Sequence, residues 1–115
     1  MKPIVSILFI VVCSFASSVF AESVDMGGMV LGPGAISCGK FLADTKDVSG
    51  EVQYFQWTLG FISGVNHVKG QSVGAGTDRF ALLKQLDNYC REHPLEMFVD
   101  AVLDLQKKLS IRAFK

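Results

Sequence analysis

The sequence predicts an all-α protein, a small four-helix orthogonal bundle with one disulfide. Apolar residues recur at helical spacing in four segments, and no segment alternates apolar and polar residues as a half-buried strand would. Glycine, proline and capping residues separate these segments by roughly three to eight residues, a usual connection length in helix bundles. These patterns together favour a helical bundle over any fold with a sheet.

The first 21 residues have the pattern of a secretory signal peptide. Lys2 provides a positive start, residues 4–12 are almost all apolar, and Val19 and Ala21 occupy the positions that a signal peptidase reads. We therefore expect cleavage after Ala21 and export to the periplasm. The alternative is a retained membrane anchor, although the apolar stretch is short for a span of about 20 residues.

Cleavage would leave 94 of the 115 residues, which is enough for one small domain. Lys2 would leave with the signal peptide, so ten basic residues would face eleven acidic ones. No basic excess remains to meet a phosphate backbone. We therefore expect no nucleic-acid partner and, after cleavage, no membrane association.

The mature chain would keep two of the three cysteines, Cys38 and Cys90, because Cys13 lies within the signal peptide. An even number of cysteines in a small exported chain predicts a disulfide, and two cysteines allow one pairing. Closing a loop of about 52 residues contributes roughly 4 kcal/mol, against about 5–15 kcal/mol of total stability for a typical domain. The alternative is two free, buried thiols.

Residues 22–36 are rich in glycine, lack periodicity and predict a flexible arm with little order before Ser37. The alternative is an arm that binds a partner through Met26, Met29, Val30 and Leu31. A helical domain would then cover residues 37–110, and residues 111–115 would form a tail. This division assigns every folded element to one domain.

Ser37 is the expected N-cap of a short first helix that ends near Lys46. Ser49 is the expected cap of a long central helix from about Glu51 to Val68. This helix contains the only tryptophan and carries two apolar stripes, one of Phe55, Leu59 and Ile62, and one of Trp57, Phe61 and Val65. A helix that is apolar nearly all round needs cover nearly all round, so we expect the other helices to surround it.

Gly60 and Gly64 lie on one face of the central helix. Each glycine in a helix interior costs about 1 kcal/mol relative to alanine. We therefore expect a neighbouring backbone to approach both closely. The same spacing occurs in membrane helix dimers, but Gln53, Gln56 and Asn66 argue against a membrane span.

A glycine-rich loop over residues 69–76 precedes the third helix, with Thr77 as its expected N-cap. His93 and Pro94 should end that helix, because the residue before proline disfavours helical geometry. Pro94 would then lie in the first turn of the fourth helix. The core face of this helix would consist of Leu95, Phe98, Val99, Val102, Leu105 or Gln106, and Leu109.

No motif indicates catalysis. Ser63 lacks the glycine spacing of a nucleophile elbow, and neither His67 nor His93 has a nucleophile nearby in sequence. Both histidines can instead serve as favourable charges near helix C-termini. Two histidines without cysteine or carboxylate at ligand spacing do not make a zinc site. We expect no enzyme, metal or cofactor, unless a pocket joins Ser63 and His67 to a carboxylate.

The order of several short motifs resembles the HdeA/HdeB family of small periplasmic acid-stress chaperones, over about residues 37–109. The matching features are Ser37-Cys-Gly-Lys-Phe-Leu-Ala43, Gly60-Phe61 with Asn66, Cys90, Phe98 with Asp100 and Val102, and Lys107-Lys108. The resemblance implies an HdeA-like helical domain with its disulfide between the first and third helices. It also implies an inactive homodimer near neutral pH that opens in acid and holds unfolding client proteins. The apolar residues released on opening, and thus the candidate client contacts, are Phe55, Trp57, Phe61 and Phe98.

A second resemblance leads to another kind of partner. Phe61-Ile-Ser-Gly-Val65 and His93-Pro94 are similar to the Rap/Tai immunity proteins, which neutralise secreted toxins of rival bacteria. This chain lacks the further cysteines that those proteins usually carry. The implied alternative is an immunity protein or inhibitor that binds a single toxin or enzyme in the periplasm.

Composition allows an acid response independently of either resemblance. Below about pH 3 most of the eleven carboxylates are protonated. Ten Lys and Arg with two His then give the mature chain a charge near +12, which repels itself and loosens the compact state. A disulfide would keep such a chain from opening fully.

Overall fold

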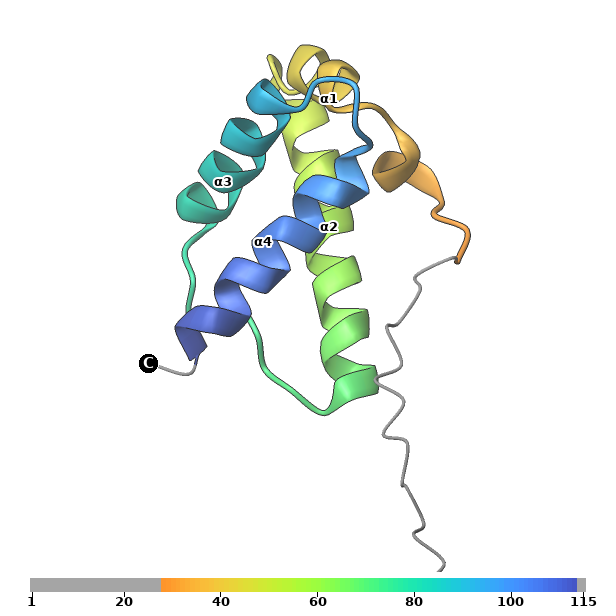
Figure 1. The fold of residues 1–115 in the computed structure, drawn as a ribbon. Helices are drawn as coiled ribbons and strands as arrows, with labels where there is room; N and C mark the ends of the chain where they lie inside the picture. The colour runs from red at the N-terminus through yellow and green to blue at the C-terminus, as the bar shows by residue number, and fades with distance from the viewer. Residues whose placement is uncertain (1–27, 114–115) are drawn as a thin grey trace, which may run out of the picture.

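The computed structural model describes residues 28–113, so the predicted signal peptide and the first part of the arm lie outside the described residues. The described part is all-α, with one 3₁₀ helix and four α-helices (Figure 1). These are η1 (Gly32–Ala35), α1 (Cys38–Asp44), α2 (Val48–Lys69), α3 (Arg79–Glu92) and α4 (Phe98–Ala113). The predicted fold class is confirmed.

The first two helices begin at side-chain caps. Ser37 caps α1 as expected, since its hydroxyl accepts a hydrogen bond from the Lys40 amide at 3.2 Å. The cap expected at Ser49 is wrong, because Asp47 caps α2 and accepts from the Gly50 amide at 2.8 Å. An aspartate cap accepts the same backbone hydrogen bond as serine, and its negative charge is also favourable at the helix N-terminus.

The third helix shows the same preference for a carboxylate cap. Asp78, not Thr77, caps α3 and accepts from the Ala81 amide at 2.9 Å. Its C-cap is His93, so the predicted break before Pro94 is confirmed. In both α2 and α3 the helix therefore begins at a nearby aspartate and not at the expected hydroxyl residue.

The fourth helix begins later than the sequence predicted. Pro94 lies in a turn, α4 starts at Phe98, and Leu95 is 96% exposed rather than part of the core. The segment between α3 and α4 instead binds the first turn of α1. The Cys38 amide donates to the Glu96 carbonyl at 2.7 Å, and the Gly39 amide donates to the Pro94 carbonyl at 2.9 Å. These bonds occupy amides that a helix N-terminus otherwise leaves free.

The buried core is built around α4 rather than α2. The residues of α4 that are less than a tenth exposed are Phe98, Val99, Ala101, Val102, Leu105, Gln106 and Leu109. Helix α2 buries four side chains, those of Tyr54, Phe55, Thr58 and Ile62. Figure 1 shows α4 crossing α2 at an angle, so that their C-terminal ends lie apart. The expectation that α2 is covered nearly all round is therefore wrong.

The surroundings of Gly60 and Gly64 also show that α2 is not covered on every face. A Cβ atom added at either position would meet no atom within 4 Å outside the local helix backbone. No neighbouring backbone packs on these glycines, contrary to the expectation. This face of α2 is open.

Helix α1 joins the other three helices at one end of the molecule. The disulfide between Cys38 and Cys90 connects α1 to α3, with 4.7 Å between the Cα atoms, which confirms the predicted pair. Phe41 of α1 stacks on Phe98 of α4 at 4.6 Å between ring centroids, and it meets Tyr54 of α2 edge-on at 5.1 Å. All these side chains are at most 3% exposed.

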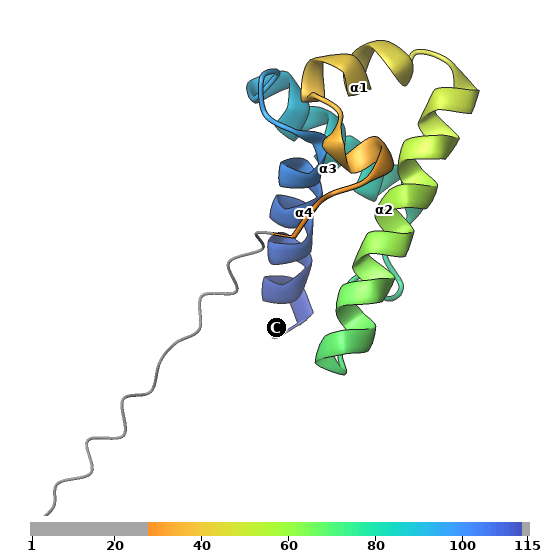
Figure 2. The ribbon, with the colours of Figure 1, turned by 90° about the vertical axis from the view of Figure 1, so that its right-hand side faces the viewer.

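The segment before α1 has more order than the sequence predicted. Residues 32–35 form η1, and Gly34 is buried against the ring of Trp57, where an added Cβ would be closer than 3.0 Å to ring carbons. The Trp57 indole N–H donates to the Leu31 carbonyl at 3.0 Å. Figure 2 shows this segment running between α2 and α4. The expected lack of structure before Ser37 is therefore wrong for these residues.

Two glycines of α2 provide a matched test of this packing. A Cβ at Gly50 would be closer than 3.0 Å to the Asp44 carbonyl, so Gly50→Ala should lower the free energy of unfolding by about 1–3 kcal/mol. Gly60→Ala should instead raise it by about 0.5–1 kcal/mol, because alanine favours the helix and the site is open. Urea unfolding followed by tryptophan fluorescence measures both. Equal effects of the two substitutions would contradict this packing.

Candidate protein-binding groove

The four residues predicted to contact clients divide into two pairs. Phe98 is fully buried in an aromatic cluster with Phe41 and Tyr54. Phe55 is 9% exposed, and the Arg79 guanidinium lies 5.0 Å from the centroid of its ring. Trp57 and Phe61 are half-buried and stack on each other with centroids 5.2 Å apart. In this conformation the second pair borders a cavity.

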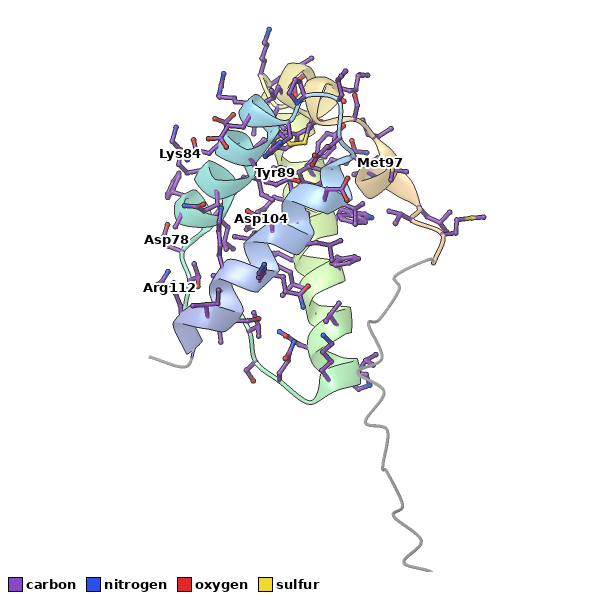
Figure 3. The ribbon with its side chains drawn as sticks, in the orientation of Figure 1. Asp78, Lys84, Tyr89, Met97, Asp104 and Arg112 are labelled. Carbon is purple, nitrogen blue, oxygen red and sulfur yellow. A yellow bond between two sulfur atoms is a disulfide. The ribbon has the colours of Figure 1, made fainter. Side chains whose placement is uncertain are left out.

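That cavity lies between the segment around η1, α2 and α4, and has a volume of about 510 Å³. Trp57 and Phe61 line it from α2, and Val99 and Leu103 line it from α4. The rim is apolar and accessible, with Met29 87%, Leu31 70% and Met97 46% exposed. Figure 3 shows Met97 where α4 meets the η1 segment. Three of the four arm residues named above as a possible partner-binding segment thus line this cavity, namely Met29, Val30 and Leu31.

A second cavity of about 300 Å³ continues along the same two helices and shares Leu103 with the first. Its lining includes Val65 and Lys69 from α2, and Gln106, Lys107 and Ser110 from α4. We call the two cavities together the α2/α4 groove. Its α2 wall is the stripe of Trp57, Phe61 and Val65, whose spacing of four residues keeps them on one helix face.

The groove differs in charge from one end to the other. Asp100 lines the end near η1, where its carboxylate also accepts from the Met97 amide at 3.1 Å. Lys69 and Lys107 line the opposite end. The adjacent Lys108 is paired with Asp104 at 2.7 Å, as the spacing predicted. The groove is therefore apolar toward η1, with Asp100 at that end, and largely polar and basic at the opposite end.

Ser63 and His67 line a separate cavity of about 450 Å³ beside the loop that follows α2. The lining of this cavity includes no carboxylate. Asn66 holds the loop, since its side-chain amide donates to the Val73 carbonyl at 3.0 Å and accepts from the Val73 amide at 3.2 Å. Within residues 28–113, no three His, Cys, Asp or Glu side chains are grouped so that they could hold a metal ion.

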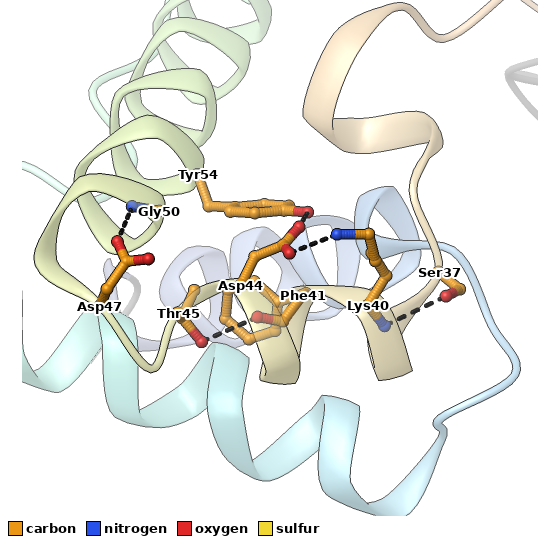
Figure 4. A network of polar contacts seen from close by, with 8 residues as sticks. All are labelled: Ser37, Lys40, Phe41, Asp44, Thr45, Asp47, Gly50 and Tyr54. Atoms are coloured by element: carbon orange, nitrogen blue, oxygen red, sulfur yellow. Dashed lines mark hydrogen bonds and ion pairs between the residues drawn. The ribbon is translucent and has the colours of Figure 1, made fainter.

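An acid-sensitive contact joins α1 to α2 next to the aromatic cluster (Figure 4). The carboxylate of Asp44 forms an ion pair with Lys40 and accepts from the Tyr54 hydroxyl at 2.8 Å. The hydrogen bond from Lys40 and then that from Tyr54 hold the pKa of Asp44 below its ordinary value of 3.8. Burial, and then the Asp44 carboxylate, raise the pKa of Tyr54.

A second carboxylate ties α3 to the connection before α4. The Tyr89 hydroxyl donates to the Glu96 carboxylate, and this bond is the main reason that the pKa of Tyr89 is raised. Tyr89 also packs on His93, with ring centroids 4.4 Å apart. Sequence spacing gave no sign of either tyrosine–carboxylate contact, because each joins different elements through tertiary packing.

No protein-family model matches the chain, and neither a curated protein nor a solved structure is significantly similar to it. None of the helices within the described part is both long and apolar enough to cross a membrane. The site is therefore interpreted from its own residues.

Asp44 gives the fold a defined response to acid. Because its folded pKa is lowered, it stabilises the protein above its unfolded pKa, near 3.9, and this stabilisation disappears as pH falls through the folded pKa. Asp44→Asn should lower the urea midpoint at pH 7, and the difference from wild type should shrink below about pH 4. Asp104→Asn removes an ion pair between neighbouring turns of one helix and should have little effect. A deficit of Asp44→Asn that is the same at pH 7 and at pH 2.5 would refute this role.

Proposed function

We propose that this protein is a periplasmic, disulfide-bonded protein-binding domain and not an enzyme. Export is supported by the signal-peptide pattern of residues 1–21, and a disulfide is typical of an oxidising compartment. The cavity that Ser63 and His67 line has no carboxylate in its lining, so it lends no support to a catalytic alternative. Binding is the function class that the accessible surface supports best.

The observation that carries this proposal is the apolar rim of the α2/α4 groove. Met29 and Leu31 are largely exposed beside the half-buried Trp57 and Phe61. Contiguous apolar patches on a soluble protein commonly mark interaction sites. Methionine and aromatic residues are also enriched at protein interfaces, and methionine adapts to partners of different shape.

The first candidate activity is that of an acid-activated chaperone that holds unfolding clients. The resemblance to HdeA/HdeB implies it, and the expected charge near +12 in acid supplies the repulsion that would loosen the bundle. Protonation of Asp44 would remove a contact between α1 and α2. Opening would add the buried Phe55 and Phe98 to the surface offered by Trp57 and Phe61, while the disulfide limits the expansion.

The second candidate is an immunity protein or inhibitor that blocks one toxin or enzyme. The observation that favours it is that the groove is already open in the folded conformation, with its rim exposed. A preformed site binds without the cost of rearrangement, and it requires no acid. A homodimer that covers the groove near neutral pH is compatible with the first candidate.

Aggregation of an acid-sensitive client, followed by light scattering at pH 2–3 and at pH 7, tests the first candidate. Equimolar protein should suppress aggregation in acid, and Met29→Asp should reduce the suppression because it places a charge on the apolar rim. The exposed Lys84→Glu variant is the control, because it changes a charge on α3, away from the rim. Absence of suppression in acid would eliminate the chaperone, and a tight 1:1 complex with one toxin at pH 7 would favour the immunity protein.

A further inference from the structure

The length of the α2/α4 groove limits what it can hold. Its α2 wall runs from Trp57 to Lys69, and twelve residues of α-helix extend about 18 Å. Both walls are helices whose lining side chains recur every three to four residues. These are Val99, Leu103 and Gln106 on α4, and Trp57, Phe61 and Val65 on α2. A third helix packs well into a groove of this kind, since its side-chain ridges match those intervals.

The charges at the two ends limit the orientation of such a helix. Lys69 and Lys107 form no ion pair with any residue between 28 and 113. Next to them lie the polar side chains of Gln71 and Ser110. A helix carries partial negative charge at its C-terminus and partial positive charge at its N-terminus. The lysines therefore favour the C-terminal end, and Asp100 favours the N-terminal end.

We infer that the α2/α4 groove binds an amphipathic helix of a partner protein, about three turns long, with an acidic side chain in its last turn next to Lys69 and Lys107. This inference rests on the proposed binding function and names the kind of partner segment. The apolar stripe of the helix would cover Trp57, Phe61 and Leu103. The carboxylate would form ion pairs with the two lysines. Such pairing gives the groove a preference for acidic helices that an apolar patch alone lacks.

The only tryptophan lies in the groove and reports its occupation directly. The chain from Glu22 onward is titrated at pH 7 and low salt with two synthetic, tryptophan-free amphipathic peptides of fourteen residues. The peptides share a leucine stripe, and one carries glutamate in its last turn where the other carries lysine. The glutamate peptide should shift the emission of Trp57 saturably and bind at least about tenfold more tightly, a difference near 1.4 kcal/mol.

Two surface variants connect this preference to the groove. Lys107→Glu should remove or reverse the preference for the glutamate peptide, whereas Lys84→Glu on α3 should leave it unchanged. Met29→Asp should weaken both peptides several-fold, because Met29 is 87% exposed on the apolar rim. Circular dichroism checks that each variant is folded. All three positions are exposed, so the substitutions should leave the fold intact and any loss of binding should come from the surface change.

Three results would overturn the inference. Equal binding of both peptides, unaffected by Lys107→Glu, would make the groove a non-specific apolar surface. A concentration-dependent shift of Trp57 emission without peptide would identify a second copy of the chain as the occupant. Tighter peptide binding after removal of residues 22–27 would identify those residues as the occupant. If clients are still held in a manner sensitive to Met29→Asp, the proposed function survives and only the acidic helix is rejected.

Discussion

The attachment of α1 to the other three helices is the constraint on which the rest of the structure depends. A seven-residue helix is too short to be stable alone, so α1 exists because its partners hold it. The disulfide fixes it to α3, Phe41 fixes it to α2 and α4, and the carbonyls of Pro94 and Glu96 occupy its first amides. The same contacts give the three longer helices a shared junction at one end of the molecule.

The open groove follows from that arrangement. The aromatic cluster holds α2 near Tyr54, whereas near its C-terminal end the hydrogen bonds of Asn66 tie the helix to the following loop and not to another helix. Beyond the cluster α4 crosses α2 at an angle, so that the two helices diverge toward their C-terminal ends. The stripe that begins at Trp57 therefore remains accessible, and a chain with a small core keeps an apolar surface beside a firmly held junction.

Local features of the sequence predicted local features of the fold. The hydroxyl of Ser37 and the proline at position 94 marked real helix boundaries, and the cysteine count left one disulfide. The helical period also placed Phe55 and Ile62 on one face of α2, and both are buried, but periodicity does not say which partner covers a helix face. The close packing expected on Gly60 is wrong for that reason, because tertiary geometry leaves the space beside it open. The groove and the Asp44 contact with Tyr54 depend on the same tertiary geometry, so no sequence spacing could have revealed them.

Amide hydrogen exchange along α2 at pH 7 tests most directly the claim that this helix is firmly joined to the bundle beside the aromatic cluster and less firmly toward its C-terminal end. Local opening costs least where few buried contacts hold an element. Amides from about Tyr54 to Thr58, beside the aromatic cluster, should exchange far more slowly than those from about Gly64 to Val68, and reduction of the disulfide should remove most of this difference. Uniform protection along α2, or a pattern unaffected by reduction, would contradict the account.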